Sequence, residues 1–169
     1  MPSLFPLSMN ILTSDNNDME QAIAANAITG LSKTGSPTSS NSTSNVGNGT
    51  RSAAIVYPAV ASDYYSVSFA VDSGRNYYTS ALAASDSGDQ ARLLVRDATN
   101  GATIDEAQNA SSSGVEALII PWTAPSTCVL ASVRFMGVGN GDTAYWDDYQ
   151  TWYQGQGVYP LPSWITRKE

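Results

Sequence analysis

Asp147 and Asp148 are adjacent carboxylates in the C-terminal third of the sequence. A pair of carboxylates hydrolyses a glycoside when both groups flank one glycosidic bond. Successive residues of a strand point to opposite faces, so we expect Asp147 and Asp148 not to share a cleft. Asp97 with Asp105 or Glu106 is an alternative pair, and no motif in the sequence brings these residues together. The sequence therefore predicts a non-enzymatic protein.

The residue types that most often carry catalysis are scarce in this chain. It has no histidine, which excludes His-based general bases, His-dependent triads and the usual zinc or iron ligand sets. Its single cysteine, Cys128, excludes an intrachain disulfide and lies in the apolar run Cys128–Ala131. Because no imidazole is available to activate it, we interpret Cys128 as a buried structural thiol.

Charge excludes further classes of partner. Fifteen acidic and eight basic residues give the chain a net charge of -7. Nucleic-acid binding needs clustered lysine and arginine, and the basic residues here are scattered, so we expect no nucleic-acid partner. No apolar stretch approaches the ~18 residues of a membrane span, and Met1–Leu7 lacks the basic and apolar regions of a signal peptide. We therefore expect no membrane partner and no secretion by a signal peptide.

Strands are the elements that must position the candidate residues. Tyr65–Val71, Ala91–Arg96 and Val129–Phe135 alternate with a period of two, which is typical of half-buried strands. Asn100-Gly101, between two short runs, predicts a hairpin turn. Further strands are expected over 9–13, 52–56, 76–84, 116–123 and 143–153. Eight or nine strands at this spacing predict an all-β protein built as an antiparallel β-sandwich.

The predicted organisation is one sandwich, residues 9–153, between two extended arms. Inside it, residues 34–50 are almost entirely polar and predict a flexible loop. The arms, 1–8 and 154–169, combine prolines with large apolar side chains, namely Leu4, Phe5, Leu7, Tyr159, Leu161, Trp164 and Ile165. Such side chains need cover, so they either fold back over the edges of their own sandwich or dock on neighbouring subunits.

Aromatic residues near the ends of two expected strands are candidates for sugar stacking. If Tyr77 faces the core, Tyr78 must face outward, and Trp146 and Trp152 share one parity along the last strand. A flat exposed ring can cover the apolar face of a pyranose. We therefore take Tyr78, Trp146 and Trp152 as candidate stacking residues. The alternative is that these rings fill the core, which is the usual place of aromatic side chains in a sandwich.

Several motifs, in order along the chain, resemble those of jelly-roll carbohydrate-binding modules. The stretches that carry the resemblance are Asn10-Ile11-Leu12 with Asp18-Met19-Glu20, Gly74-Arg75-Asn76-Tyr77 through Ser80-Ala81-Leu82, Leu94-Val95-Arg96-Asp97 with Gly101, Trp122-Thr123-Ala124-Pro125, and Trp146-Asp147-Asp148-Tyr149. The resemblance spans about residues 9–153 and implies an antiparallel jelly-roll sandwich. Function transfers poorly across such sandwiches, so it implies a fold more strongly than an activity.

The resemblance also implies a metal site. These modules often hold a structural calcium ion with the acidic residue that follows the first strand and an aspartate of the closing strand. The matching positions are Glu20 and Asp147 or Asp148. Hard oxygen ligands suit calcium. The alternative is that the two aspartates cap turns or pair with arginine.

The sequence leaves two candidate functions. The same kind of domain resembles small structural proteins of tailed-phage virions, and the apolar arms favour assembly. The first expectation is therefore a capsid decoration or cement protein on the outer surface of a bacteriophage virion. It would bind the major capsid protein or other virion subunits and form a homo-oligomer, a dimer or a trimer. The alternative is a carbohydrate-binding module or a tail receptor-binding protein that recognises a polysaccharide.

Overall fold

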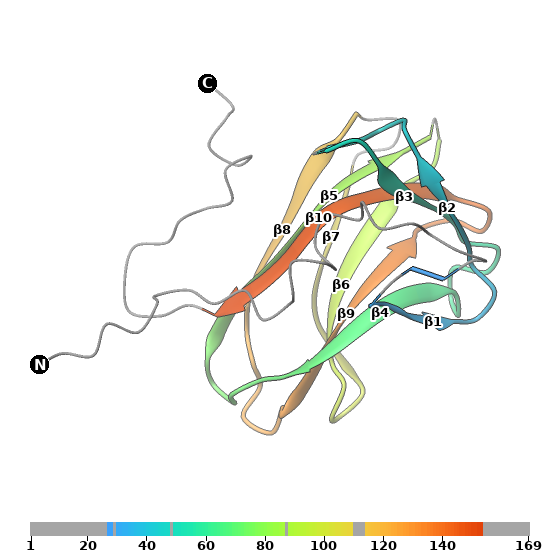
Figure 1. The fold of residues 1–169 in the computed structure, drawn as a ribbon. Helices are drawn as coiled ribbons and strands as arrows, with labels where there is room; N and C mark the ends of the chain where they lie inside the picture. The colour runs from blue at the N-terminus through green and yellow to red at the C-terminus, as the bar shows by residue number, and fades with distance from the viewer. Residues whose placement is uncertain (1–26, 29, 48, 87, 110–113, 154–169) are drawn as a thin grey trace, which may run out of the picture.

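The computed structural model describes residues 27–153 apart from 29, 48, 87 and 110–113. These residues form ten antiparallel strands and the loops that connect them (Figure 1). One sheet, called the β10 sheet here, contains in spatial order β2 (Thr38–Ser42), β3 (Ser52–Val56), β10 (Thr143–Tyr153), β5 (Asn76–Ser85) and β8 (Glu116–Thr123). The other, the β9 sheet, contains β1 (Ser32–Thr34), β4 (Tyr64–Ala70), β9 (Leu130–Gly137), β6 (Ala91–Asp97) and β7 (Ala102–Gln108). The described residues include no helix, so the predicted all-β antiparallel sandwich is confirmed, with ten strands rather than eight or nine.

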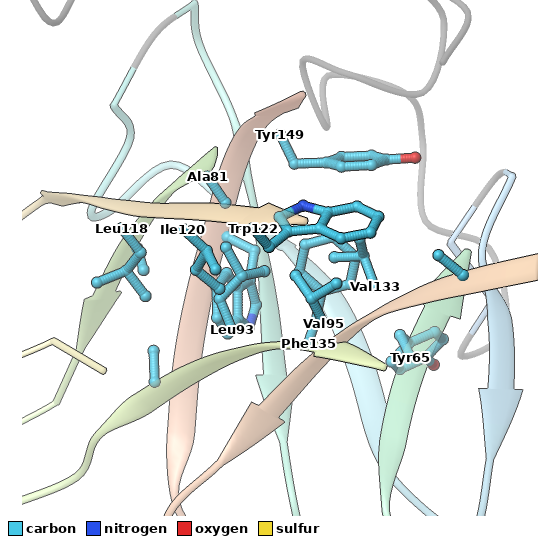
Figure 2. Packing of buried hydrophobic residues seen from close by; sticks show 14 of the residues in the cluster. Tyr65, Ala81, Leu93, Val95, Leu118, Ile120, Trp122, Val133, Phe135 and Tyr149 are labelled. Carbon is cyan, nitrogen blue, oxygen red and sulfur yellow. The ribbon is translucent and has the colours of Figure 1, made fainter. Parts of the chain in front are cut away.

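The core lies between the two sheets. The apolar positions of the alternating strands point into it, as Figure 2 shows for Leu93 and Val95 from one sheet and Ile120 and Trp122 from the other. Phe135 lies at its centre, fully buried, and meets the rings of Trp146 and Tyr149 edge-on in the same interior. Each fully buried side chain of this size stabilises the fold by roughly 1.5–3 kcal/mol before conformational entropy is subtracted.

A two-residue hairpin signal correctly marked the turn between β6 and β7. Gly101 adopts a φ of 76°, and its N–H donates to the carbonyl of Asp97 at 2.9 Å. The carboxylate of Asp97 also accepts from the backbone N–H and the side-chain amide of Asn100, at 3.0 and 2.7 Å. The turn is thus held by side-chain bonds in addition to the left-handed glycine that its geometry requires.

The segment predicted as a flexible polar loop, 34–50, contains a strand. Its residues Thr38–Ser42 form β2, which pairs with β3 along its whole length. Ser39 explains why a polar run can join a sheet, because its hydroxyl lies 2.9 Å from the Tyr65 hydroxyl in the buried space between the sheets. A hydrogen bond across the sandwich replaces the apolar contact that sequence patterning looks for.

A β-bulge interrupts β10 at Asp148. On this strand Asp147 pairs with Leu82 and Gln150 with Ser80, so two residues, Asp148 and Tyr149, lie opposite one residue of β5. Asp148 has a φ of 42°, in the left-handed region that non-glycine residues rarely adopt. One extra residue in a strand reverses the inward and outward alternation beyond it. The two ends of β10 therefore present opposite parities to the core.

Several predictions concern residues outside the described part of the chain. They are the strand over 9–13, Glu20 as a calcium ligand, and the two arms with their seven apolar side chains. These remain predictions, as do the domain boundaries that depend on them.

Candidate functional site

Two of the aromatic rings proposed for stacking lie together on the outer face of the β10 sheet. Trp152 on β10 pairs in register with Tyr78 on β5, and their rings stack with centroids 5.9 Å apart and planes 18° apart. Tyr78 in turn pairs with Pro121 on β8. Three flat apolar groups therefore lie in one row across three strands, with Tyr78 half-buried in the middle and Pro121 exposed at the edge.

The third proposed ring, Trp146, does not belong to this face. It is fully buried between the sheets, and its Nε1–H donates to the Tyr57 hydroxyl at 3.0 Å. The prediction that Trp146 and Trp152 share a face is wrong, because the bulge at Asp148 lies between them and reverses the alternation. Trp146 therefore has a structural role in the core and cannot contact a sugar.

An open cavity of about 250 Å³ lies at the Tyr78 end of the sheet. Its lining combines aromatic, apolar and polar groups: Asn76, Tyr77, Tyr78, Pro121, Trp122 and Thr123. Two of the lining residues, Tyr77 and Trp122, stack with ring centroids 4.6 Å apart. At its rim the Thr123 hydroxyl donates to Asn76 Oδ1 at 2.6 Å, which leaves the Asn76 amide group as a donor toward the cavity. Flat apolar surface with a few fixed polar groups is typical of a small-ligand site.

A second cavity of about 210 Å³ adjoins the first through Tyr77. It is lined by Ala70, Val71, Asp72, Arg75, Tyr77 and Tyr153. Arg75 forms an ion pair with Asp72 at 2.7 Å and lies 4.8 Å above the ring of Tyr153. The Tyr77 hydroxyl accepts the N–H of Asp72 at 2.8 Å, which orders the turn that separates the cavities.

The middle of the same face is covered rather than open. Gly47 lies directly over Leu82, so close that an added Cβ at Gly47 would collide with the leucine side chain. Its N–H donates to Asp147 Oδ2 at 3.0 Å, which ties the turn after β2 to the sheet. Tyr145, on the same face beyond this cover, is held at the opposite end through its hydroxyl bond to Asp86. The two cavities described above lie at the Tyr78 end of this face, beyond the cover.

Asp147 and Asp148 lie beneath this cover and are both buried. Asp147 Oδ1 accepts the N–H of Asp148 at 2.8 Å, and Asp148 Oδ1 accepts from the Gln150 side chain at 3.1 Å. The simple alternation that was expected to separate the two carboxylates fails at the bulge. Neither residue lines either of the two cavities described above.

In the calcium site that the resemblance implies, the two carboxylates would supply part of the ligand set. Buried, hydrogen-bonded oxygen donors on one bulge match the chemistry of a calcium ligand set. Among the described residues, however, no three acidic, histidine or cysteine side chains come together as such a set. The remaining predicted ligand, Glu20, lies outside the described residues. Calcium therefore stays a prediction that a chelation experiment can test.

Cys128 has the environment of an inert thiol. It is fully buried, its Sγ donates to the carbonyl of Leu130 at 3.4 Å, and burial raises its pKa to about 11. Burial also raises the pKa of the Tyr149 hydroxyl well above its usual range. Neither group is a nucleophile or base at neutral pH. Within the described ranges no helix has the length and apolar character needed to cross a membrane.

The alternation of residues along β8 predicts part of the lining of the first cavity. Leu118, Ile120 and Trp122 of β8 face the core, so alternation places Pro121 and Thr123 on the same outer face as Tyr78. The cover at Gly47 had no such signal, because it depends on a contact between distant parts of the chain.

Solved structures share this fold. The chain is similar to the CBM22-1–GH10 modules of Clostridium thermocellum endo-1,4-beta-D-xylanase 10B complexed with xylohexaose (TM-score 0.63, 19% identity), covering 85% of this chain and 28% of that one. It is also similar to the CBM22-1 xylan-binding domain from Paenibacillus barcinonensis (TM-score 0.64, 14% identity, 83% of this chain and 94% of that one). The fold is that of the jelly-roll carbohydrate-binding modules. No family model and no curated protein sequence matches the chain.

The jelly-roll fold also occurs in a virion protein. The enzymatically active domain of bacteriophage CBA120 tailspike protein 4 matches with a TM-score of 0.57 and 14% identity, over 85% of this chain and 21% of that chain. At these identities the likeness extends to the fold and not to the activity.

Proposed function

We propose that this chain binds a carbohydrate at the Tyr78 end of the β10 sheet. The observation that carries the proposal is the Tyr78 ring, stacked on Trp152 and bordering an open cavity whose rim bears Asn76 and Thr123. The fold supports it, because similar folds occur in a xylan-binding domain and in the CBM22-1–GH10 modules of a xylanase complexed with xylohexaose.

Binding at this site needs no bond to be broken. The apolar face of a pyranose stacks on the Tyr78 ring, and Pro121 extends the flat surface by one strand. The amide and hydroxyl of Asn76 and Thr123 then hydrogen-bond the sugar hydroxyls and fix the orientation of the ring. Trp152 is 5% exposed, so its part is to support Tyr78 from behind rather than to meet the ligand.

The decisive experiment measures binding of the full chain to xylohexaose and to a panel of neutral polysaccharides by calorimetry and affinity electrophoresis. We expect Tyr78→Ala to weaken binding about tenfold, the equivalent of about 1.4 kcal/mol, while Tyr78→Phe keeps the ring and most of the affinity. Tyr145→Ala is the matched control, because Tyr145 is a half-buried tyrosine on the same face at its other end. Equal losses for the two alanine variants, or no binding at millimolar sugar, would contradict the proposal.

The capsid decoration reading remains a prediction that rests on the two arms. No contact among the described residues favours it, and the tailspike likeness concerns the fold alone. A tail protein that binds a host polysaccharide would use the same Tyr78 site, so it is a setting for the proposed function rather than a rival. Whether the protein resides on the virion surface, and whether it binds the major capsid protein, depends on what the arms contact.

A further inference from the structure

The outer face of the β9 sheet brings together three arginines that are scattered in the sequence. Arg92 and Arg96 lie on β6, and Arg134 on the adjacent β9 pairs in register with Leu94 between them. The three side chains therefore form a triangle across two neighbouring strands, with diagonal neighbours about 7–8 Å apart at the backbone. We call Arg92, Arg96 and Arg134 the arginine face. It lies on the opposite side of the sandwich from Tyr78.

This positive charge is nearly uncompensated, although the chain has fifteen acidic residues. Glu106 approaches the arginine face to 3.9 Å, measured from Arg92 Nη1, and both side chains are partly exposed. Within the described part of the chain, no carboxylate lies within 4.0 Å of Arg96 or Arg134. By contrast, Arg75, in the turn between β4 and β5, has a carboxylate at 2.7 Å.

The surroundings of Arg134 disfavour its positive charge. Its guanidinium lies 4.1 Å above the ring of Tyr64, and its Nε is buried without a hydrogen-bond partner. Burial, and the neighbouring charge of Arg96, lower the pKa of Arg134 below its usual value. Arg92 Nε is buried without a partner as well. A partly desolvated cation that lacks a counter-charge is stabilised when an anion joins it.

The aliphatic parts of the arginine side chains cover apolar residues of the sheet, but this packing does not require their positive charges. Leu94 and Met136 are almost fully buried on this outer face, and Arg92 Nη2 lies 3.7 Å from the Met136 sulfur. Long neutral side chains would cover the same apolar atoms without placing like charges side by side. The clustering of three guanidinium groups therefore points to a ligand that carries negative charge.

We propose that the arginine face binds carboxylate or sulfate groups of an acidic polysaccharide. Guanidinium groups bind such oxyanions through paired hydrogen bonds. The net charge of -7 repels a polymer as densely charged as nucleic acid, whereas charges spaced by sugar rings meet the three arginines locally. The choice of a polysaccharide as the ligand rests on the proposed function, whereas the argument that the ligand carries negative charge is independent of it. Two faces would then bind two kinds of sugar.

The test uses the full chain in affinity electrophoresis and calorimetry at low salt. The probes are polygalacturonate for carboxylates, dextran sulfate for sulfates, neutral dextran, and polyglutamate as an acidic polypeptide. We expect Arg96→Gln and Arg134→Gln each to weaken binding to the preferred acidic polysaccharide about tenfold, and the double variant to abolish it. Lys33→Gln is the matched control, since it removes one charge at the exposed β1 edge strand and should leave binding within twofold.

Tyr78→Ala separates this inference from the proposed function, because it should leave binding to the acidic polymer unchanged. Melting temperatures of all variants show whether the fold is retained, and Arg134→Met, a long neutral side chain, replaces Arg134→Gln if the latter unfolds. The inference is overturned if neither acidic polysaccharide binds at low salt, or if the arginine variants bind as the parent does. Equal or tighter binding of polyglutamate would also overturn it, in favour of an acidic polypeptide.

Discussion

The ring of Trp152 lies behind the ring of Tyr78, in register across two strands and 5.9 Å away between centroids. Tyr78 has an open cavity on one side, so this support limits where its ring can move. We expect Trp152→Ala to weaken sugar binding severalfold although the tryptophan barely reaches solvent, because a loosely held ring loses more freedom on binding. Calorimetry of the variant measures the loss. An unchanged affinity in a folded Trp152→Ala protein would show that Tyr78 needs no support.

Trp146 should contribute to stability and not to binding. Its indole N–H donates to the buried Tyr57 hydroxyl, whose pKa burial raises well above its usual value. Tyr57→Phe and Trp146→Phe should each lower the free energy of unfolding by about 1–3 kcal/mol, because each leaves a buried polar atom unpaired. Chemical denaturation of both variants and of the double variant measures their coupling, expected at about 1 kcal/mol. Strictly additive losses would mean that the bond contributes nothing.

Calcium should stabilise the fold if Glu20 joins Asp147 or Asp148 as a ligand. A ligand that binds only the folded state raises the melting temperature by mass action, so a chelator should lower it and added calcium should restore it. Of Asp147→Asn and Asp148→Asn, the one that removes the ligand should abolish this response, and exposed Asp105→Asn should keep it. Identical melting curves with and without chelator would remove the metal site.

Acid should destabilise the protein in part through Asp63. The N–H of Ser36 donates to its Oδ1 at 3.0 Å and, with the N–H of Ala59 at 2.8 Å, lowers the pKa of this carboxyl below 3.8. A depressed folded pKa stabilises the fold above the unfolded pKa, and the effect is lost as the pH falls through the folded pKa. Asp63→Asn should therefore melt lower than the parent at pH 7, with a difference that shrinks below pH 3.8. A pH-independent difference, or an equal effect of Asp105→Asn, would refute this.

Deleting both arms, 1–8 and 154–169, separates assembly from sugar binding. If the arms dock on other subunits, the truncated chain should keep its far-ultraviolet circular dichroism but lose self-association or attachment to particles. Sedimentation and co-purification with particles measure this. A truncated chain that associates like the parent would contradict the assembly prediction and leave recognition to the outer faces of the sandwich.

How far the sequence predicted this molecule depends on whether the relevant interaction is local. Period-two alternation predicted β4, β6 and β9, and the dipeptide Asn100-Gly101 predicted a hairpin turn. Both predictions succeed because each signal involves residues that are close together in the sequence. Tyr78 was placed on the outer face for the same reason. The strand β2 was missed because its inward group is a serine bonded to Tyr65, far along the chain. The parity of Trp146 and Trp152 was wrong because a bulge leaves no mark in the period of a polar and aromatic run.

The bulge at Asp148 divides β10 into two parts, and the inward and outward positions of each part are set independently. Before the bulge Ala144 and Trp146 point to the interior, and after it Gln150 and Trp152 point to the outer face of the β10 sheet. Substitution of the half-buried, outward-facing Gln150 should therefore change the outer face with little penalty to the interior, whereas Tyr149 and Thr151 remain part of the interior. Deleting the single residue Asp148 would remove this separation and exchange the inside and outside of everything that follows.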